Sequence, residues 1–248
     1  MIPAALAVVV PAHNEERRIE ACLRSVHRAA ARAAPLPVLI VVAADACTDA
    51  TATLAADGGA EVVKVEGHNV GAARAAAAGR AMELLADTAP DVWLAVTDAD
   101  TTVPESWLTH QIALARRGYD VVLGTIRLAT TASGSLIVAR HDADYFRTRP
   151  SAGAGTAWEH PHVHGANMGL SATAYRRVGG FAALPTGEDR DLVRRLAASG
   201  HRIARTDRHP VHTAARLRGR APGGLADLLA ALRPAARNRT LSPGTGGS

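Results

Sequence analysis

The first half of the chain alternates short, continuous apolar runs with longer segments of helical spacing. Apolar runs without polar alternation are typical of strands that are buried on both faces. We expect such strands over residues 6–10, 38–42, 61–65, 92–97 and 120–125. Helices are expected over residues 16–32, from Thr48 or Asp49 onward, over 71–85 and from Pro104 onward. Strands that alternate with helices predict an α/β fold with a Rossmann-like, mostly parallel sheet flanked by helices.

The second half has a less regular pattern. Residues 129–164 are rich in Thr, Ser, Gly, His and Arg, with one helix expected over 137–146, and we expect this region to be mobile. A helix over 189–199 and a strand over 201–206 are expected next. Beyond these the pattern predicts a short helix over 225–232 and then a disordered end.

The composition fits one soluble globular domain. The 248 residues are 48% hydrophobic and 21% charged, which is ordinary for a chain with a packed core. No apolar run approaches the roughly 20 residues that span a bilayer. Because the N-terminus also lacks the basic start of a signal peptide, we expect a cytoplasmic protein without a transmembrane segment. Cys22 and Cys47 are too few for a disulfide framework or a four-thiolate metal site, and we interpret both as small apolar filler.

The charge is unevenly distributed along the chain. Residues 1–170 hold 14 Lys and Arg against 18 Asp and Glu, a net charge of −4, whereas residues 171–248 hold 14 against 5, a net charge of +9. A basic half invites a nucleic-acid hypothesis. Its aromatic residues are only Tyr175 and Phe181, a poor stacking platform for bases. Arginine supplies nearly all of the positive charge and suits contacts with phosphate or carboxylate groups, so we expect no nucleic-acid partner.

Polar motifs follow the first two expected strands, at the edge of the sheet where α/β proteins bind ligands. The loop after the first strand, residues 11–16, opens onto a helix N-terminus that can bind a phosphate or a base, or Asn14 is only a cap. Asp45 ends the second strand and can accept hydrogen bonds from a base or a ribose. No G-x-G-x-x-G follows either strand, which disfavours a dinucleotide site.

An arginine occupies an unusual place at the start of the third helix. Gly71 opens this helix and Arg74 lies in its first turn, where the helix dipole disfavours basic residues. Either Arg74 meets an anion there, or it is simply solvated.

Two carboxylates follow the fourth expected strand. Asp98 and Asp100 are two positions apart, so in an extended segment they point to one face. Hard oxygen ligands select Mg²⁺ or Mn²⁺, and Mg²⁺ shares its coordination with phosphate oxygens. The alternative is a capped turn ahead of Pro104.

Further candidates lie in the second half. Asp189 is one of three acids that begin an expected helix. Either it acts as a general base, or the three acids are there because the helix dipole favours them. His212 could complete a metal shell begun by the aspartates, and arginines could neutralise a diphosphate. These arginines are Arg216, Arg218 and Arg220. The alternating histidines His160, His162 and His164, with His209 and His212, suggest zinc, but no acid or cysteine lies alongside, so zinc is disfavoured.

Taken in order, these motifs resemble the family 2 glycosyltransferases, which have the GT-A fold. The resemblance runs from about Leu6 to Arg220. The matching segments are PAHNE at 11–15, ADACTD at 44–49, NVG at 69–71 with Arg74, TDAD at 97–100, GANMG at 165–169, VGGF at 178–181 and GED at 187–189. Each segment is weak alone, and their order and spacing make the resemblance specific.

The resemblance implies roles for these residues. Asp45 would bind the nucleobase of the donor, Asp98 would lie near the nucleoside, Asp100 would bind a metal that bridges the diphosphate, and Asp189 would be the catalytic base. His212 is similar to a histidine that some members use as a further metal ligand. The remaining donor-binding set would be Pro11, His13, Glu15, Asn69, Gly71, Arg74, Arg216 and Arg220. The chain departs from the family at Ala44, where two consecutive acids are common, and at 46–47, where Gly-Ser is usual.

The implied domain therefore has a nucleotide-sugar-binding half at 1–128, an acceptor-binding and catalytic half at 129–220, and a C-terminal helix and tail at 221–248. The implied activity is metal-dependent, inverting transfer of a hexosyl group from a nucleoside-diphosphate sugar, with a UDP-sugar favoured, to a hydroxyl acceptor. The cofactor would be Mg²⁺ or Mn²⁺. A nucleotidyltransferase, a catalytically silent nucleotide-sugar-binding protein and a nucleic-acid binder stay open as alternatives. The basic, apolar tail suits either a peripheral contact with an anionic membrane or a homodimer contact.

Overall fold

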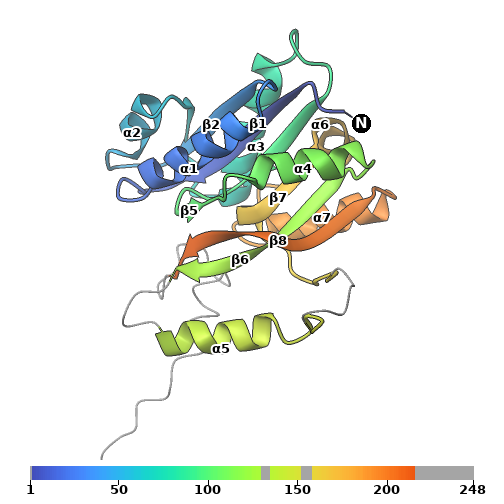
Figure 1. Ribbon diagram of the computed structural model, residues 1–248. Helices are drawn as coiled ribbons and strands as arrows, with labels where there is room; N and C mark the ends of the chain where they lie inside the picture. Colours follow the sequence, from blue (N-terminus) through green and yellow to red (C-terminus); the bar gives the residue numbers. More distant parts are fainter. Residues whose placement is uncertain (1, 130–134, 152–157, 216–248) are drawn as a thin grey trace, which may run out of the picture.

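The computed structural model describes residues 2–129, 135–151 and 158–215 (Figure 1). The expected helix over 225–232, the disordered end, and Arg216, Arg218 and Arg220 lie outside the described residues.

Helices and strands alternate through the first half as the apolar pattern predicts. The elements up to residue 129 are β1 (Ala5–Ala12), α1 (Ile19–Arg32), β2 (Val38–Asp45), α2 (Thr51–Asp57), β3 (Glu61–Val65), α3 (Val70–Leu84), β4 (Val92–Val96), β5 (Thr101–Thr102), α4 (Trp107–Arg116) and β6 (Val121–Ala129). The later elements are α5 (Ser135–Tyr145), the 3₁₀ turn η1 (Gly165–Asn167), β7 (Met168–Ser171), α6 (Ala172–Arg177), α7 (Glu188–Ala198) and β8 (Ile203–Ala214).

The strands of the described residues form one mixed sheet in the order β3-β2-β1-β4-β7-β6-β8-β5. β1 pairs in parallel with β2 and β4, β2 with β3, and β6 with β8. The antiparallel pairs are β7 with β4 and with β6, and β5 with β8. The sheet is therefore mostly parallel, as expected, and the buried strand β7 is inserted between two strands that run the other way.

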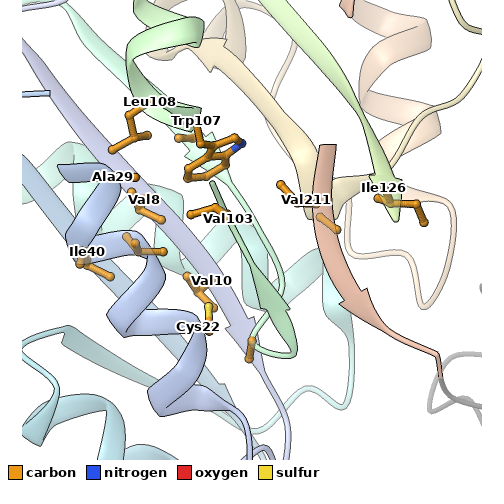
Figure 2. Packing of buried hydrophobic residues seen from close by; sticks show 14 of the residues in the cluster. Val8, Val10, Cys22, Ala29, Ile40, Val103, Trp107, Leu108, Ile126 and Val211 are labelled. Atoms are coloured by element: carbon orange, nitrogen blue, oxygen red, sulfur yellow. The ribbon is translucent and has the colours of Figure 1, made fainter. Parts of the chain in front are cut away.

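The sheet is buried on both faces by two hydrophobic clusters. In β1, Leu6, Val8 and Val10 belong to the cluster under α1 and α4, while Ala7 and Val9 belong to the cluster under α3, α6 and α7. Figure 2 shows the first of these, with Cys22 and Ala29 of α1 and Trp107 of α4 packed toward β1. Fully burying an aliphatic side chain stabilises a fold by about 1.5–3 kcal/mol. This two-sided burial explains why the strands read as continuous apolar runs.

Several elements differ from the sequence-based expectation. β8 extends to Ala214, although a strand was expected only over 201–206, so His209 and His212 lie within a strand. α1 begins at Ile19, because residues 15–18 form a turn in which the Arg18 N–H donates to the Glu15 carbonyl. The short strands β5 and β7 and the six-residue helix α6 were not expected. Within the described residues, no helix is both long and apolar enough to cross a membrane.

The start of α3 packs closely against the segment before α7 because Gly71 has no side chain. A Cβ added to Gly71 would lie 2.1 Å from the Ala182 carbonyl oxygen and 3.0 Å from the backbone of Leu184. Gly71 was expected to bind the donor, and in this structure it admits a backbone segment. The contact brings the first turn of α3 close to the segment that leads into α7.

We expect Gly71→Ala to lower the free energy of unfolding by about 1–3 kcal/mol, because overpacking against backbone forces a shift. The matched control is Gly79→Ala in the same helix, where an added Cβ meets nothing within 4 Å. That variant should gain up to about 1 kcal/mol from helix propensity. Urea unfolding of the two variants and the wild type measures both effects. Equal stability of the two variants would contradict the packing role of Gly71.

Candidate active site

Three loops at the carboxyl ends of β1, β2 and β3 each contain a non-glycine residue in the left-handed region. These residues are Asn14 with φ 51°, Ala46 with φ 46° and His68 with φ 45°. Such conformations are uncommon and cluster at functional sites. The first two loops are also joined to each other, since the Thr48 N–H donates to Asn14 Oδ1 at 2.8 Å. The structure therefore builds a constrained rim at this edge of the sheet.

The Asp45 carboxylate organises this rim from below. It is 4% exposed and accepts the N–H groups of Gly67, His68 and Asn69 at 2.7, 2.9 and 2.7 Å. Its expected contact with a nucleobase would therefore have to use the acceptor capacity that these three bonds leave. In the structure, the Asp45 carboxylate fixes the loop between β3 and α3.

Two further candidates also have structural roles at this rim. Asn69 caps α3, because its Oδ1 accepts the Ala72 N–H at 2.9 Å. His13 Nδ1 lies 2.6 Å from the Asp45 carbonyl oxygen, and its ring meets the exposed His68 ring edge-on with 5.5 Å between centroids. His68 was not among the candidates.

A cavity of about 280 Å³ opens beside the loop after β1. It is lined by Asn14, Glu15, Glu16, Arg17, Arg18 and Asp49. Of the expected donor-binding residues that the structure describes, only Glu15 belongs to this lining, and Pro11 is buried in β1. Cys47 is half-buried between the two loops, with its Sγ 3.4 Å from the Asn14 nitrogen, so the filler interpretation holds for Cys22 only.

Arg74 meets two carboxylates of the protein itself. Its side chain is 5% exposed, with Nη2 donating to Asp98 Oδ1 at 2.5 Å and Nη1 donating to Glu188 Oε1. Burial alone would lower the Arg74 pKa, but the charges of Asp98 and Glu188 raise it above its ordinary value. Burial raises the pKa of Glu188, and Arg74 opposes that shift. The expectation that Arg74 meets an anion is confirmed for protein carboxylates rather than for a ligand.

The aspartates after β4 lie on one loop in different surroundings. Asp98 is half-buried and paired with Arg74, while Asp100 Oδ1 accepts from Thr213 Oγ1 of β8 at 3.3 Å. His212 is exposed and precedes Thr213, so strand alternation places its side chain on the opposite face of β8. In the described part of the chain no three His, Cys, Asp or Glu residues form a group that could hold a metal ion. Joint metal binding by Asp100 and His212 stays a prediction.

Asp189 lies in the first turn of α7 and is half-buried. Its Oδ2 accepts the Gly165 N–H at 2.9 Å and its Oδ1 accepts the Arg190 N–H at 2.7 Å. Because Glu188 is paired with Arg74, and Arg74 with Asp98, the acids at the start of α7 and the acids after β4 share one site. The sequence could not show this, since Arg74 and Glu188 are 114 positions apart.

The alternating histidines form a stack with the side chain of Tyr145, at the end of α5. The His162 ring lies parallel to the Tyr145 ring with 3.7 Å between centroids, and His164 Nε2 is 3.0 Å from the Tyr145 hydroxyl. His160 Nε2 lies 3.1 Å from the Leu123 carbonyl oxygen. The neighbouring imidazoles stack on one another and bond to protein oxygens. No metal-binding group includes them within the described ranges.

A mostly parallel sheet with acidic motifs beyond β4 and at the start of α7 is the architecture of GT-A glycosyltransferases. The chain belongs to glycosyl transferase family 2, whose family model matches residues 7–179. No curated protein sequence matches the chain significantly.

The solved structures that resemble the chain share its fold. S. aureus TarS 1-349 in complex with UDP-GlcNAc has a TM-score of 0.62 and 15% identity, covering 92% of this chain and 66% of its own. The Pyrobaculum calidifontis mannosyltransferase PcManGT, in complex with GDP-Man and Mn²⁺, has a TM-score of 0.58 and 21% identity, covering 88% and 59%. Glucosyl-3-phosphoglycerate synthase from Mycobacterium tuberculosis, with Mn²⁺, UDP and phosphoglyceric acid, has a TM-score of 0.55 and 19% identity, covering 92% and 77%. The chain thus spans less than two thirds of the TarS fragment and of PcManGT.

We expect Asp45→Asn to destabilise the fold, because an amide nitrogen would face N–H donors that the carboxylate now satisfies. Loss of such bonds costs about 1–3 kcal/mol of unfolding free energy. The control is Asp57→Asn at the exposed end of α2, where removing an acid should be neutral or slightly stabilising. Urea unfolding measures both variants, and a wild-type midpoint for Asp45→Asn would refute the role.

Acid should destabilise the protein through the histidine stack. Burial lowers the pKa of His164 to about 3, and it lowers the pKa values of His160 and His162. An unfolded histidine titrates near pH ~6.5. The stabilising contribution is therefore present above that pH and is lost as the pH falls toward the folded pKa values.

Melting temperatures between about pH 7 and about pH 4.5 test this contribution. We expect a decline in the wild type and a shallower decline in His164→Gln, whose amide can still bond to Tyr145. The control is His27→Gln, which changes an exposed imidazole on α1. The same acid slope in all three proteins would rule out the stack as the cause.

Proposed function

We propose that the protein transfers a sugar, of the hexosyl type, from a nucleoside-diphosphate sugar to a hydroxyl acceptor, with inversion at the anomeric carbon. The observation that carries this proposal is the bridge through Arg74, which bonds to Asp98 and to Glu188. The bridge holds the Asp-x-Asp loop close to the start of α7, which carries the candidate base Asp189, at the carboxyl edge of the sheet. Family membership supports the same reading.

The donor would lie over the rim formed by the loops after β1, β2 and β3. The cavity beside residues 14–18, whose lining includes Arg17 and Arg18, suits a nucleoside and its phosphates. We favour a UDP-sugar, with a GDP-sugar as the alternative. Structures with UDP-GlcNAc and with GDP-Man resemble the chain to a similar degree, so the comparison does not separate them.

The two carboxylates after β4 fit a hard divalent cation such as Mg²⁺ or Mn²⁺. Such ions take one or two carboxylates and complete their coordination with water and substrate phosphates, so a third protein ligand is not required. Asp100, with Asp98 beside it, would hold the ion. When bound, the ion stabilises the negative charge that grows on the departing diphosphate.

Asp189 would act as the general base. Its carboxylate accepts two backbone N–H bonds, which fix its rotation. The acceptor oxygen would form a bond to the anomeric carbon as the bond from that carbon to the diphosphate oxygen breaks. The acceptor proton would pass to a free lone pair of Asp189.

A silent nucleotide-sugar-binding protein is the second candidate. The observation that favours it is the ion pair of Asp98 with Arg74, which engages one of the two carboxylates that a metal would use. Binding without turnover would identify it.

We expect UDP or GDP to raise the melting temperature, more strongly with Mn²⁺, and Asp100→Ala to remove the metal-dependent part. Asp189→Asn should keep the shift but lower the turnover number for hydrolysis of UDP-glucose, UDP-GlcNAc or GDP-mannose by about 10²- to 10⁴-fold, with water as acceptor. The control is Asp191→Asn, the same change two residues further along α7, where the acid pairs with Arg194 and Arg195. No shift with either nucleotide, or wild-type turnover in Asp189→Asn, would contradict the proposal.

A further inference from the structure

We propose that Arg74 and Glu188 are a positioning pair that sets the place of the Asp189 carboxylate relative to the Asp98 loop. The inference rests on the proposed function, since it concerns the geometry of the base. Neither residue needs to touch the substrate in this role.

The pair is closed off from solvent. The side chains of Arg74 and Glu188 are 5% and 4% exposed, and one terminal nitrogen of the guanidinium serves each carboxylate partner. Phe181 lies on the guanidinium with 5.9 Å from Cζ to the ring centroid. The planar guanidinium is bonded through both terminal nitrogens and packed on one face, so its position is fixed. The carboxylates of Asp98 and Glu188 are therefore fixed relative to each other.

Gly165 transmits this position to Asp189. A Cβ added to Gly165 would lie 2.3 Å from Arg74 Cζ, so the guanidinium packs directly on the glycine backbone. The N–H of the same glycine donates to Asp189 Oδ2 at 2.9 Å. A shift of the guanidinium would therefore move the peptide that holds the base.

Glu188 provides a second connection between Arg74 and the base. It is the first residue of α7 and is directly followed by Asp189, so the pairing of Glu188 with Arg74 also fixes the start of this helix. Two connections, one through Gly165 and one through α7, meet at the same carboxylate.

A contribution to folding stability does not by itself explain why Arg74 and Glu188 form a buried ion pair. Replacing a buried ion pair by apolar residues of similar volume is often neutral or stabilising, whereas removing one partner is costly. A pair kept for positioning should therefore be replaceable as a unit without loss of folding but with loss of turnover. This separates the inference from a purely structural role.

The test compares Glu188→Gln, Glu188→Met, Arg74→Met and the double variant Arg74→Met/Glu188→Met in the hydrolysis of UDP-glucose, UDP-GlcNAc or GDP-mannose. We expect Glu188→Gln to lower kcat by about 10- to 100-fold, because a misplacement near 1 Å has effects of that size. KM for the donor and the melting shift with UDP and Mn²⁺ should stay within about twofold of wild type. The double variant should melt closer to the wild-type temperature than Arg74→Met does, because only the partly exposed Asp98 is left unpaired. It should lose no more turnover than the worse of Arg74→Met and Glu188→Met, as residues that act as a unit do.

The matched control is the half-buried pair of Arg80 on α3 with Glu61 on β3, changed as Arg80→Met/Glu61→Met. It should leave kcat and KM unchanged. Wild-type kcat in Glu188→Gln or in the double variant would overturn the inference, as would losses that multiply. A parallel loss of kcat, donor binding and melting temperature would also overturn it, since that is the result of a structural role. If Asp189→Asn turns over like the wild type, or the wild type neither binds UDP or GDP nor turns over, the proposed function itself fails.

Discussion

The buried guanidinium of Arg74 is the contact on which the rest of the site depends. It takes a carboxylate from the loop after β4 and another from the start of α7, and it packs on the backbone of Gly165. These three segments are the loop after β4, the turn that leads into β7 and the start of α7. A charge at this depth is tolerated because two opposite charges meet it. Its position thereby defines how the two acidic motifs stand to each other.

A second framework holds the loops after β1, β2 and β3. The carboxylate of Asp45 fixes the loop between β3 and α3 through three backbone bonds, and Asn14 joins the loops after β1 and β2. Three left-handed residues result along this edge. The constraint leaves backbone groups and the rings of His13 and His68 at the rim, whereas Asp45 itself is buried. The polar motifs of the first half thus fix the conformation of these loops as well as placing side chains at the rim.

The sequence predicts the parallel part of the fold well, because strands buried on both faces leave a continuous apolar signal. It misses β7, whose four residues MGLS are too short to show a period, and most of β8, whose second half is polar. Strand ends and helix starts point to Asp98, Arg74 and Asp189 as candidate site residues. No local pattern in the sequence shows the long-range contacts. These are the partners of Arg74 and Asp45, the packing role of Gly71, and the contact with Asp100 that Thr213 makes rather than His212.

The most direct test of the central claim is a crystal structure with a non-hydrolysable UDP-sugar and Mn²⁺. The account predicts a diphosphate at the loop of Asp98 and Asp100, an anomeric carbon facing Asp189, and Arg74 still bonded to Asp98 and Glu188. A diphosphate bound directly by Arg74 with both carboxylate bonds broken, or a sugar bound away from Asp189, would contradict it.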